Sequence, residues 1–408
     1  MAGPLQGVLV LDLSRILAGP WATQVLADFG AEVIKVEHPR GGDDTRKWGP
    51  PYLKDRDGRD TSESAYYLAA NRGKRSVAID LGLAEGQALV RHLAAKSDVL
   101  VENFKVGGLA KYGLSYADLG PVNPRLVYLS ISAFGQDGPD ASGPGYDAMI
   151  QGMGGLMSLT GVPDGEPGAG PQKVGVAVAD LMCGMYAVSA ILAALHERHA
   201  SGQGQYIDLS LLDTQVAWLA NQNMNYLVTG ESPRRQGTAH PNIVPYQSFA
   251  TADGYLMLAV GNDAQFARFC TVAGAPELAG DPRYATNRDR VAHRRELVPV
   301  VEQLLRKRSS AQWLEALRAA QVPCGPINDL ARVFAEPQVR HRGLRLNLPH
   351  PVAGSLPGVR NPVVFSRTPI EYERPPPALG ADTDDVLREY LGLDGTTLEG
   401  LRERRVIA

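Results

Sequence analysis

In the first third of the chain, short apolar runs alternate with segments of helical periodicity. The apolar runs have the length of strands and occupy residues 7–13, 32–37, 76–81, 99–102 and 125–131. Helical patterns lie at residues 21–29 and 84–96. Strands that alternate with helices form a parallel sheet with both faces covered. The pattern therefore predicts an α/β fold with a large Rossmann-like domain.

The pattern of apolar and polar residues changes twice in the rest of the chain. Residues 177–195 form a long apolar stretch that Asp180, Gly184 and Ser189 interrupt, which favours a buried core helix over a membrane span. A further helical run at 211–227 precedes a polar linker at 230–241. Two strands and several helices then indicate a smaller α+β domain, and a proline-rich connection precedes a final helix. The predicted parts are 1–225, 226–330 and 331–408, with the last part returning to the large domain.

Composition narrows the class of protein. The 41 Lys+Arg and 44 Asp+Glu residues nearly balance, so a nucleic-acid or membrane-surface partner is not expected. Three widely spaced cysteines favour neither a disulfide scaffold nor a zinc site, and no metal site is predicted. The N-terminus lacks the features of a secretory signal. We expect a cytoplasmic protein.

Several catalytic motifs are missing from the sequence. There is no G-x-S-x-G, H-E-x-x-H or G-x-x-x-x-G-K-[ST] pattern, which removes the main support for a serine hydrolase, a zincin or a P-loop protein. The first strand-to-helix turn, residues 14–20, also lacks the G-x-G-x-x-G spacing that brings backbone against a dinucleotide. A nicotinamide cofactor is therefore disfavoured.

Asp180 is a lone carboxylate in an apolar segment. Burying an unpaired charge is costly, so the side chain must be hydrogen-bonded or functional. It could cap a helix that begins at Leu181, or it could be a nucleophile. The two roles are compatible, because N–H groups at the start of a helix would keep the carboxylate ionised.

The motif ADLMCGMYA around Asp180, together with NRGKRSVAIDL, VLVENFKVGGLAKYGL, QGTAHPNIVPYQSF, VFAEPQVRHRGL and RPPPALG, resembles the class III CoA-transferase family. Formyl-CoA transferase and carnitine CoA-transferase belong to this family, and the resemblance is greatest to its succinate–hydroxymethylglutarate CoA-transferases. It extends from residue 5 to about 380. It implies an enzyme that moves CoA from an acyl-CoA, here succinyl-CoA, to a free carboxylic acid, here a dicarboxylate.

The resemblance also implies how the reaction proceeds. Asp180 would attack the thioester to give an aspartyl-acyl anhydride and then an aspartyl-CoA thioester. Asp147 falls where formyl-CoA transferase has a glutamate near the reacting centre, although a turn or capping role is the alternative. Related α-methylacyl-CoA racemases carry a catalytic histidine where this chain has Tyr146. This difference weakens the hypothesis that the protein is a racemase, because exchange of an α-proton needs an acid/base pair. A racemase and a catalytically silent CoA-binding protein remain alternatives.

Further residues are implied by position in the family motifs. Those expected to bind CoA are Leu17, Ala18, His38, Ile79, Leu81, Asn103, Phe104, Lys105, Lys111, Gly145 and Tyr146. Formyl-CoA transferase has glutamine in place of Leu17 and arginine in place of His38. Gly237 and His240 lie in a segment similar to the family's mobile substrate loop, for which a plain linker is the alternative. Arg15 and Arg46 are candidates for the acceptor's distal carboxylate, and structural ion pairs are the alternative for both.

The resemblance finally implies an interlocked homodimer, in which each chain threads through a ring made by its partner. CoA and acyl-CoA would be substrates, and no permanently bound cofactor is expected.

Overall fold

The computed structural model describes residues 3–408, which form two compact units. The first unit runs to Leu156, resumes over Lys173–Glu231 and ends with Arg342–Ala408. The second unit contains Met157–Gln172 and Ser232–His341. The sequence placed boundaries at 225 and 330 and assigned residues 157–172 to the large domain.

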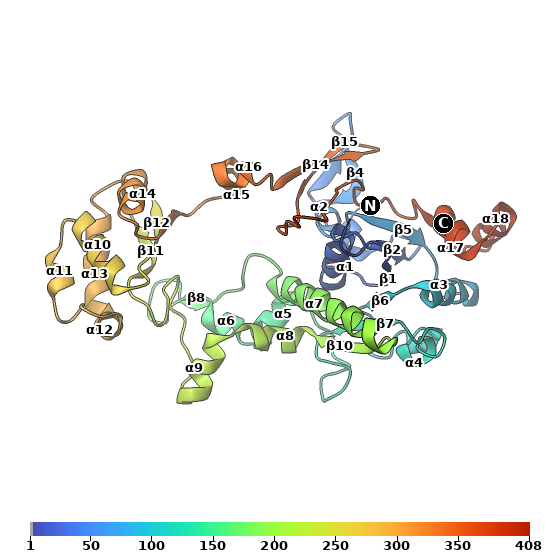
Figure 1. Cartoon of the computed structure of the whole chain (residues 1–408), viewed down its shortest axis with the longest axis horizontal. Helices are drawn as coiled ribbons and strands as arrows, with labels where there is room; N and C mark the ends of the chain where they lie inside the picture. The colour runs from blue at the N-terminus through green and yellow to red at the C-terminus, as the bar shows by residue number, and fades with distance from the viewer. Residues whose placement is uncertain (1–2) are drawn as a thin grey trace. The chain divides into compact units, whose positions relative to one another are not determined.

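A parallel sheet of six strands organises the first unit (Figure 1). The strands of this sheet, within the described residues, are β1 (Leu9–Asp12), β2 (Glu32–Glu37), β5 (Lys74–Ala78), β6 (Val99–Glu102), β7 (Val127–Ser132) and β10 (Tyr206–Ser210). Their order is β10-β7-β6-β1-β2-β5, and every neighbouring pair is parallel. The predicted α/β class with a large parallel sheet is confirmed.

The strand order reverses its direction between β1 and β6. From β1 the chain proceeds outward to β2 and β5, and it then returns to β6 and proceeds the other way to β7 and β10. In open α/β sheets such a switch point leaves a crevice at the carboxyl ends of the two central strands, where ligands bind. The segments after Asp12 and after Glu102 therefore mark the expected site.

Helices cover both faces of this sheet. Successive residues of a strand point to opposite faces, so Leu9 and Leu11 pack on one side and Val10 on the other. The first face is covered by α3 (Ala84–Lys96), α17 (Thr383–Leu391) and α18 (Gly395–Glu403). The second face is covered by α1 (Ala18–Asp28) and α7 (Val178–Ser201). The final helices thus return to the large unit, and their apolar residues complete its core.

The long apolar helix α7 packs closely on α1. A Cβ atom added at Gly184 would lie 2.8 Å from the carbonyl oxygen of Ala18, so only glycine allows the two backbones this approach. Among residues 3–408, α7 is the one helix long and apolar enough to span a membrane, and half of its most apolar stretch is buried.

Two predicted elements are corrected by the structure. The helix predicted at 211–227 is two helices, α8 (Leu211–Trp218) and α9 (Asn221–Thr229), because Ala220 adopts a positive φ of 47° that breaks the helical path. The proline-rich connection contains an antiparallel hairpin of β14 (Arg345–His350) and β15 (Gly354–Val359). A strand of an isolated pair has one free edge, which tolerates Pro349 and Pro357.

The second unit has its own sheet and core. The antiparallel strands β11 (Tyr246–Ala250), β12 (Tyr255–Ala259) and β13 (Cys324–Pro326) pack against helices. The helices that contribute buried apolar residues are α10 (Asp263–Val272), α13 (Arg294–Leu305) and α14 (Ser310–Ala319). Trp313 is buried there and donates its indole N–H to the carbonyl of Leu305 at 2.7 Å. The expected α+β character of this part is present.

Shorter elements complete the described chain. In the first unit they are η1 (Asp44–Lys47), β3 (Tyr52–Lys54), β4 (Asp60–Ser64), α2 (Ala65–Leu68), η2 (Ala110–Tyr112), α4 (Tyr116–Leu119) and α5 (Asp147–Met153). The others are α6 (Leu156–Leu159), β8 (Gly161–Val162), β9 (Gly170–Pro171), α11 (Glu277–Gly280), α12 (Asn287–Ala292), α15 (Leu330–Ala335) and α16 (Pro337–His341).

Candidate active site

A pocket of about 230 Å³ lies at the switch point of the large sheet. It is lined by the turn after β1, the segment after β6 and the first turn of α7. It brings together the predicted residues Arg15, Leu17, Ala18, Asn103, Phe104, Lys105, Gly145, Tyr146 and Asp180. Sequence reasoning did not single out Ile16, Ser132, Ser142 or Leu211, which also line it.

A second pocket of about 360 Å³ shares Arg15 and Phe104 with the first. Its lining includes the predicted residues His38, Ile79 and Leu81. Lys111 lines neither pocket, but its Nζ lies 4.6 Å from the ring centroid of Tyr112, which does line the second. The two pockets together collect most of the residues predicted to bind CoA.

Asp180 is the third residue of α7, because the helix begins at Val178 and Ala177 is its N-cap. The capping position expected for Asp180 is therefore wrong, although the side chain does lie in the first turn. Asp180 is 8% exposed. Burial, and after it the negative charge of Asp147, raises the pKa of Asp180 to about 7. The expectation that N–H groups at the start of the helix keep this carboxylate ionised is thus corrected: near neutral pH it changes between acid and carboxylate.

Asp147 is the first residue of α5 and caps the neighbouring helix α7. Its Oδ1 accepts hydrogen bonds from the backbone N–H groups of Ala179 at 2.8 Å and Asp180 at 3.4 Å. Its Oδ2 accepts from the Gln151 side chain at 2.7 Å. Asp147 therefore does lie beside Asp180, where it both fixes the start of α7 and acts on the Asp180 carboxylate through its charge.

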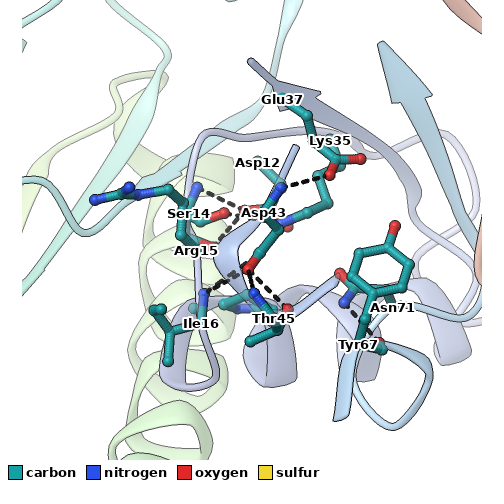
Figure 2. Close-up of polar contacts among 12 residues, drawn as sticks. Asp12, Ser14, Arg15, Ile16, Lys35, Glu37, Asp43, Thr45, Tyr67 and Asn71 are labelled. Atoms are coloured by element: carbon teal, nitrogen blue, oxygen red, sulfur yellow. Dashed lines mark hydrogen bonds and ion pairs between the residues drawn. The ribbon is translucent and has the colours of Figure 1, made fainter. Parts of the chain in front are cut away.

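The turn between β1 and α1 has a strained backbone. Ile16 has a φ of 72°, a left-handed conformation that costs a residue other than glycine about 1–3 kcal/mol. The Asp43 carboxylate accepts from the Ile16 N–H at 3.2 Å (Figure 2). The Asn103 side chain accepts from the Arg15 N–H at 2.8 Å. The turn ends at Leu17, the N-cap of α1, which lines the same pocket as Asp180.

Buried charged side chains lie near this turn, and Figure 2 shows Asp12, Lys35 and Asp43 among them. Lys35 donates to the Ser14 carbonyl at 2.8 Å and pairs with Asp43 at 3.0 Å. Lys74 pairs with Asp12 at 3.1 Å. None of these four charges was predicted from the sequence. A signal was present, because Asp12 is the one charged residue of an apolar strand and Lys35 lies between the apolar residues Ile34 and Val36.

The two candidate arginines have different surroundings. The Arg15 side chain is half-exposed, lines both pockets and pairs with Asp44 at 3.1 Å. Arg46 is buried and makes a bidentate pair with Glu37 at 2.8 and 2.7 Å, and it also donates to the Tyr67 hydroxyl and the Pro377 carbonyl. The expectation for Arg46 is therefore corrected: its donors are engaged within the fold, and it lines neither pocket.

Gly237 and His240 belong to the second unit. Gly237 has a φ of 59°, which suits glycine. The His240 backbone N–H donates to the Tyr246 carbonyl at 2.9 Å, and Arg294 donates to the His240 carbonyl at 2.9 Å. Burial and the charge of Arg294 lower the pKa of His240. Within residues 3–408 the structure contains no group of three or more His, Cys, Asp or Glu side chains arranged to hold a metal ion.

Residues 5–383 match the sequence profile of CoA-transferase family III. The chain belongs to this family. The match includes all the strands, the helix that carries Asp180 and the whole second unit. All residues that line the two pockets lie within the matched range. The predicted family membership is confirmed.

This CoA-transferase is similar along nearly its full length to other CoA-transferases and to a protein of known structure. A succinate–glutarate CoA-transferase of Agrobacterium fabrum is 54% identical over 96% of this chain and 97% of its own. The human succinyl-CoA:glutarate CoA-transferase is 43% identical over 99% of this chain and 90% of its own. The crystal structure of a CAIB/BAIF family protein from Brucella suis superposes with a TM-score of 0.84 at 48% identity, covering 96% and 100% of the two chains.

Proposed function

We propose that this CoA-transferase moves CoA from succinyl-CoA to a C4 to C6 dicarboxylate, with glutarate as the expected acceptor, through covalent intermediates on Asp180. Relatives at 54% and 43% identity are named for succinate or succinyl-CoA and for glutarate, which supports this pair of substrates. The observation that carries the proposed mechanism is the buried Asp180 carboxyl in the pocket at the switch point of the sheet. A carboxylate nucleophile needs this access to substrate and this shelter from water.

The proposed chemistry balances without a further reactant. The Asp180 carboxylate attacks the succinyl thioester carbonyl, the C–S bond breaks, and a mixed anhydride and CoA thiolate form. The thiolate attacks the Asp180 carbonyl of the anhydride and releases succinate, leaving an aspartyl-CoA thioester. The acceptor carboxylate attacks this thioester and expels the thiolate, which then attacks the acceptor's acyl carbon. Acyl-CoA leaves, and the Asp180 carboxylate is restored with no net change in protons or electrons.

The environment of Asp180 suits this sequence of steps. A carboxylate with a raised pKa is a stronger base, and therefore a better nucleophile, than an exposed one once it is ionised. Its pKa of about 7 leaves it ionised in a substantial fraction of molecules at neutral pH. The N-terminus of α1 at Leu17 and Ala18 adds a partial positive charge to the same pocket, where the thioester oxygen and the thiolate become negative.

CoA would extend from Asp180 across both pockets. The segment Asn103 to Lys105 and the backbone of Gly145 and Tyr146 would contact the pantetheine arm in the first pocket. Ile79, Leu81 and His38 would contact the nucleotide in the second. Lys111, exposed beside Tyr112, would offer a phosphate contact. CoA enters here as a substrate, and the proposal includes no permanently bound cofactor.

Arg15 is the remaining arginine candidate for the acceptor's second carboxylate. That carboxylate would be buried without a partner in a closed site unless a cation lay nearby. Arg15 lines both pockets and is half-exposed, so its pairing with Asp44 can be exchanged for a ligand. In an Arg15→Met variant we expect glutarate to lose most of its advantage over valerate, measured as the ratio of their kcat/KM values. An unchanged ratio would remove Arg15 from this role while leaving the transferase assignment in place.

We also propose a cytoplasmic, interlocked homodimer in which the segment of Gly237 and His240 closes over the intermediate. Apolar side chains in α9 support a partner surface: Met224, Tyr226, Leu227 and Val228 are between 51% and 76% exposed in the single chain. Contiguous exposed apolar groups mark protein interfaces. Analytical ultracentrifugation would show a dimer, and a monomer at micromolar concentration would contradict this part of the proposal.

The transferase proposal is tested by product analysis and by trapping. Purified protein with succinyl-CoA and glutarate should give glutaryl-CoA and succinate in equal amounts. Hydroxylamine added during turnover should modify Asp180, which peptide mass spectrometry would locate. Labelling of another residue would relocate the nucleophile. Incorporation of solvent deuterium at the α-carbon of an α-methylacyl-CoA, without transfer, would favour the racemase alternative, and no product from either assay would favour a silent CoA-binding protein.

A further inference from the structure

The turn from Ser14 to Leu17 is fixed by side chains that come from three other segments. Asn103, after β6, accepts from the Arg15 N–H at 2.8 Å and donates to the Arg15 carbonyl at 2.7 Å. Lys35, in β2, donates to the Ser14 carbonyl at 2.8 Å. Asp43, before η1, accepts from the Ile16 N–H with Oδ1 at 3.2 Å and Oδ2 at 3.3 Å. A short turn with this many fixed backbone groups has a single well-defined geometry.

Ile16 has the most strained backbone conformation in this turn. Its φ of 72° is unfavourable for a β-branched residue, which would relax to a negative φ unless surrounding groups prevented it. The bond from the Ile16 N–H to Asp43 is the contact that holds this peptide group in the left-handed orientation (Figure 2). Relaxation of Ile16 would move the next residues, Leu17 and Ala18, which line the pocket with Asp180.

Asp43 is itself held rigidly. It is 1% exposed and pairs with Lys35, whose side chain is fully buried, at 3.0 Å. Thr45 donates to its Oδ1 from the backbone at 3.0 Å and from the hydroxyl at 2.7 Å. Lys35 therefore binds both the turn, at Ser14, and the residue that holds the turn, Asp43.

We propose that Asp43, fixed by Lys35, is a positioning residue for CoA transfer: it holds Ile16 in the left-handed conformation and thereby sets the N-terminus of α1 opposite Asp180. Asp43 lines the second pocket but not the pocket that contains Asp180, so its effect on the reaction passes through Ile16 and Leu17. Groups that stabilise developing charge must be placed in advance, and a shift of about 1 Å costs about 100-fold in rate. This inference rests on the proposed role of Asp180.

The test is a double-mutant cycle between Asp43→Ala and Ile16→Gly, because alanine removes both oxygens that accept from the Ile16 N–H, whereas asparagine would keep one. We expect Asp43→Ala to lower kcat by about 10- to 100-fold, with the KM for succinyl-CoA changed less than about threefold. Glycine adopts a positive φ without penalty, so Ile16→Gly in the Asp43→Ala background should recover at least about fivefold in kcat. A merely structural role of Asp43 would show no such recovery. Thr45→Val is the matched control, because it removes one bond to Asp43 but keeps the Ile16 contact, and its kcat should stay within about threefold of wild type.

A second pair of variants keeps the test decisive if Asp43→Ala does not fold. Ile16→Pro deletes the N–H that Asp43 accepts and fixes φ near −65°, whereas Ile16→Gly keeps that N–H. Both lose the Ile16 side chain, and we expect kcat of the proline variant to be at least about tenfold lower. Equal kcat values for the two, or a loss in Asp43→Ala that glycine does not recover, would overturn the proposal. Failure of the Asp180 proposal is distinguishable, because Asp180→Asn would then retain activity whatever the cycle shows.

Discussion

Two buried carboxyl groups, Asp12 at the carboxyl end of β1 and Asp180 in the first turn of α7, differ in the charged groups that surround them. Asp12 is 0% exposed and Asp180 is 8% exposed. Burial is the largest influence on both pKa values and acts to raise them. Lys74 and Lys35, with two hydroxyl groups, outweigh it at Asp12 and lower the pKa to about 2. Asp180 faces Asp147 instead, and its pKa rises to about 7.

The difference separates a structural carboxylate from the carboxylate that we propose as the nucleophile. Asp12 stays ionised at every physiological pH, because Lys74 would otherwise lose its buried ion-pair partner. Asp180 gains nothing from its charge in the free protein, so the charge remains available for attack on a substrate. Similar burial therefore serves opposite purposes, and the nearest charged neighbour decides which.

Neutralising Asp180 should give the largest effect on activity. We expect Asp180→Asn to lower kcat by about 1,000-fold or more, because the amide cannot form the anhydride. The free energy of unfolding at pH 8 should stay the same or rise, since an uncompensated buried charge is removed. Stopped assays with mass-spectrometric detection and urea denaturation would measure the two quantities. Activity within tenfold of wild type would contradict the role given to Asp180.

The same substitution at Asp12 should act on stability. We expect Asp12→Asn to lower the free energy of unfolding by about 3–5 kcal/mol, because Lys74 loses its buried partner. The exposed pair Lys54–Asp60 provides the control, and Asp60→Asn should cost less than about 1 kcal/mol. Urea denaturation at pH 7 would compare them. Equal losses in the two variants would show that burial does not determine how much each ion pair contributes to the free energy of unfolding.

The pH dependence of the reaction should report the Asp180–Asp147 interaction. In the free enzyme, kcat/KM should rise with pH through about 7, as Asp180 loses its proton. Asp147→Asn removes the nearby negative charge while keeping an acceptor oxygen, so the rise should move to lower pH. It should still lie above the usual range for an aspartate, because burial persists. The exposed Asp140→Asn should leave the profile unchanged. A profile that Asp147→Asn does not move would contradict the assigned coupling.

The smallest expected effect is a pH dependence of stability from the paired cluster. Burial, opposed by Asp12, lowers the pKa of Lys74 to about 8, from 10.5 in the unfolded chain. Between these values the unfolded chain binds more protons, so this residue should make stability rise with pH by at most about 1.4 kcal/mol per pH unit. The Lys74→Met variant should lack this contribution. Unfolding curves of both proteins from pH 8 to 9.5 would show whether the slopes differ.

The sequence predicted the sheet and the burial of Asp180 well because both depend on local pattern. The strands 32–37 and 99–102 and the helix 84–96 were predicted with the bounds the structure gives. Asp180 stood out as a single charge in an apolar helix, and the structure does bury it beside the predicted residues of the pocket. Hydrophobic periodicity and an isolated charge are both visible without knowing what packs against what.

The roles of Arg46 and Asp43 depended on partners distant in sequence. Arg46 binds Glu37 and the Pro377 carbonyl, 331 residues away, and no local pattern reveals that its donors are occupied. Asp43 lies in a polar segment typical of a loop, yet it is buried against Lys35 and holds Ile16. The break at Ala220 and the hairpin of β14 and β15 were likewise hidden, because both override the local preference of their residues.

The sequence by itself determined the class of fold, the family motifs and which carboxylate stands alone in an apolar helix. The tertiary structure alone decided how that carboxylate behaves. Asp12 and Asp180 are both single acidic residues in apolar segments, and nothing in either segment distinguishes them. Lys74 reaches Asp12 from a strand 62 residues away, whereas the residue that reaches the start of α7 is Asp147. The energy of a buried charge depends on the charges around it in space, and folding alone brings those charges together.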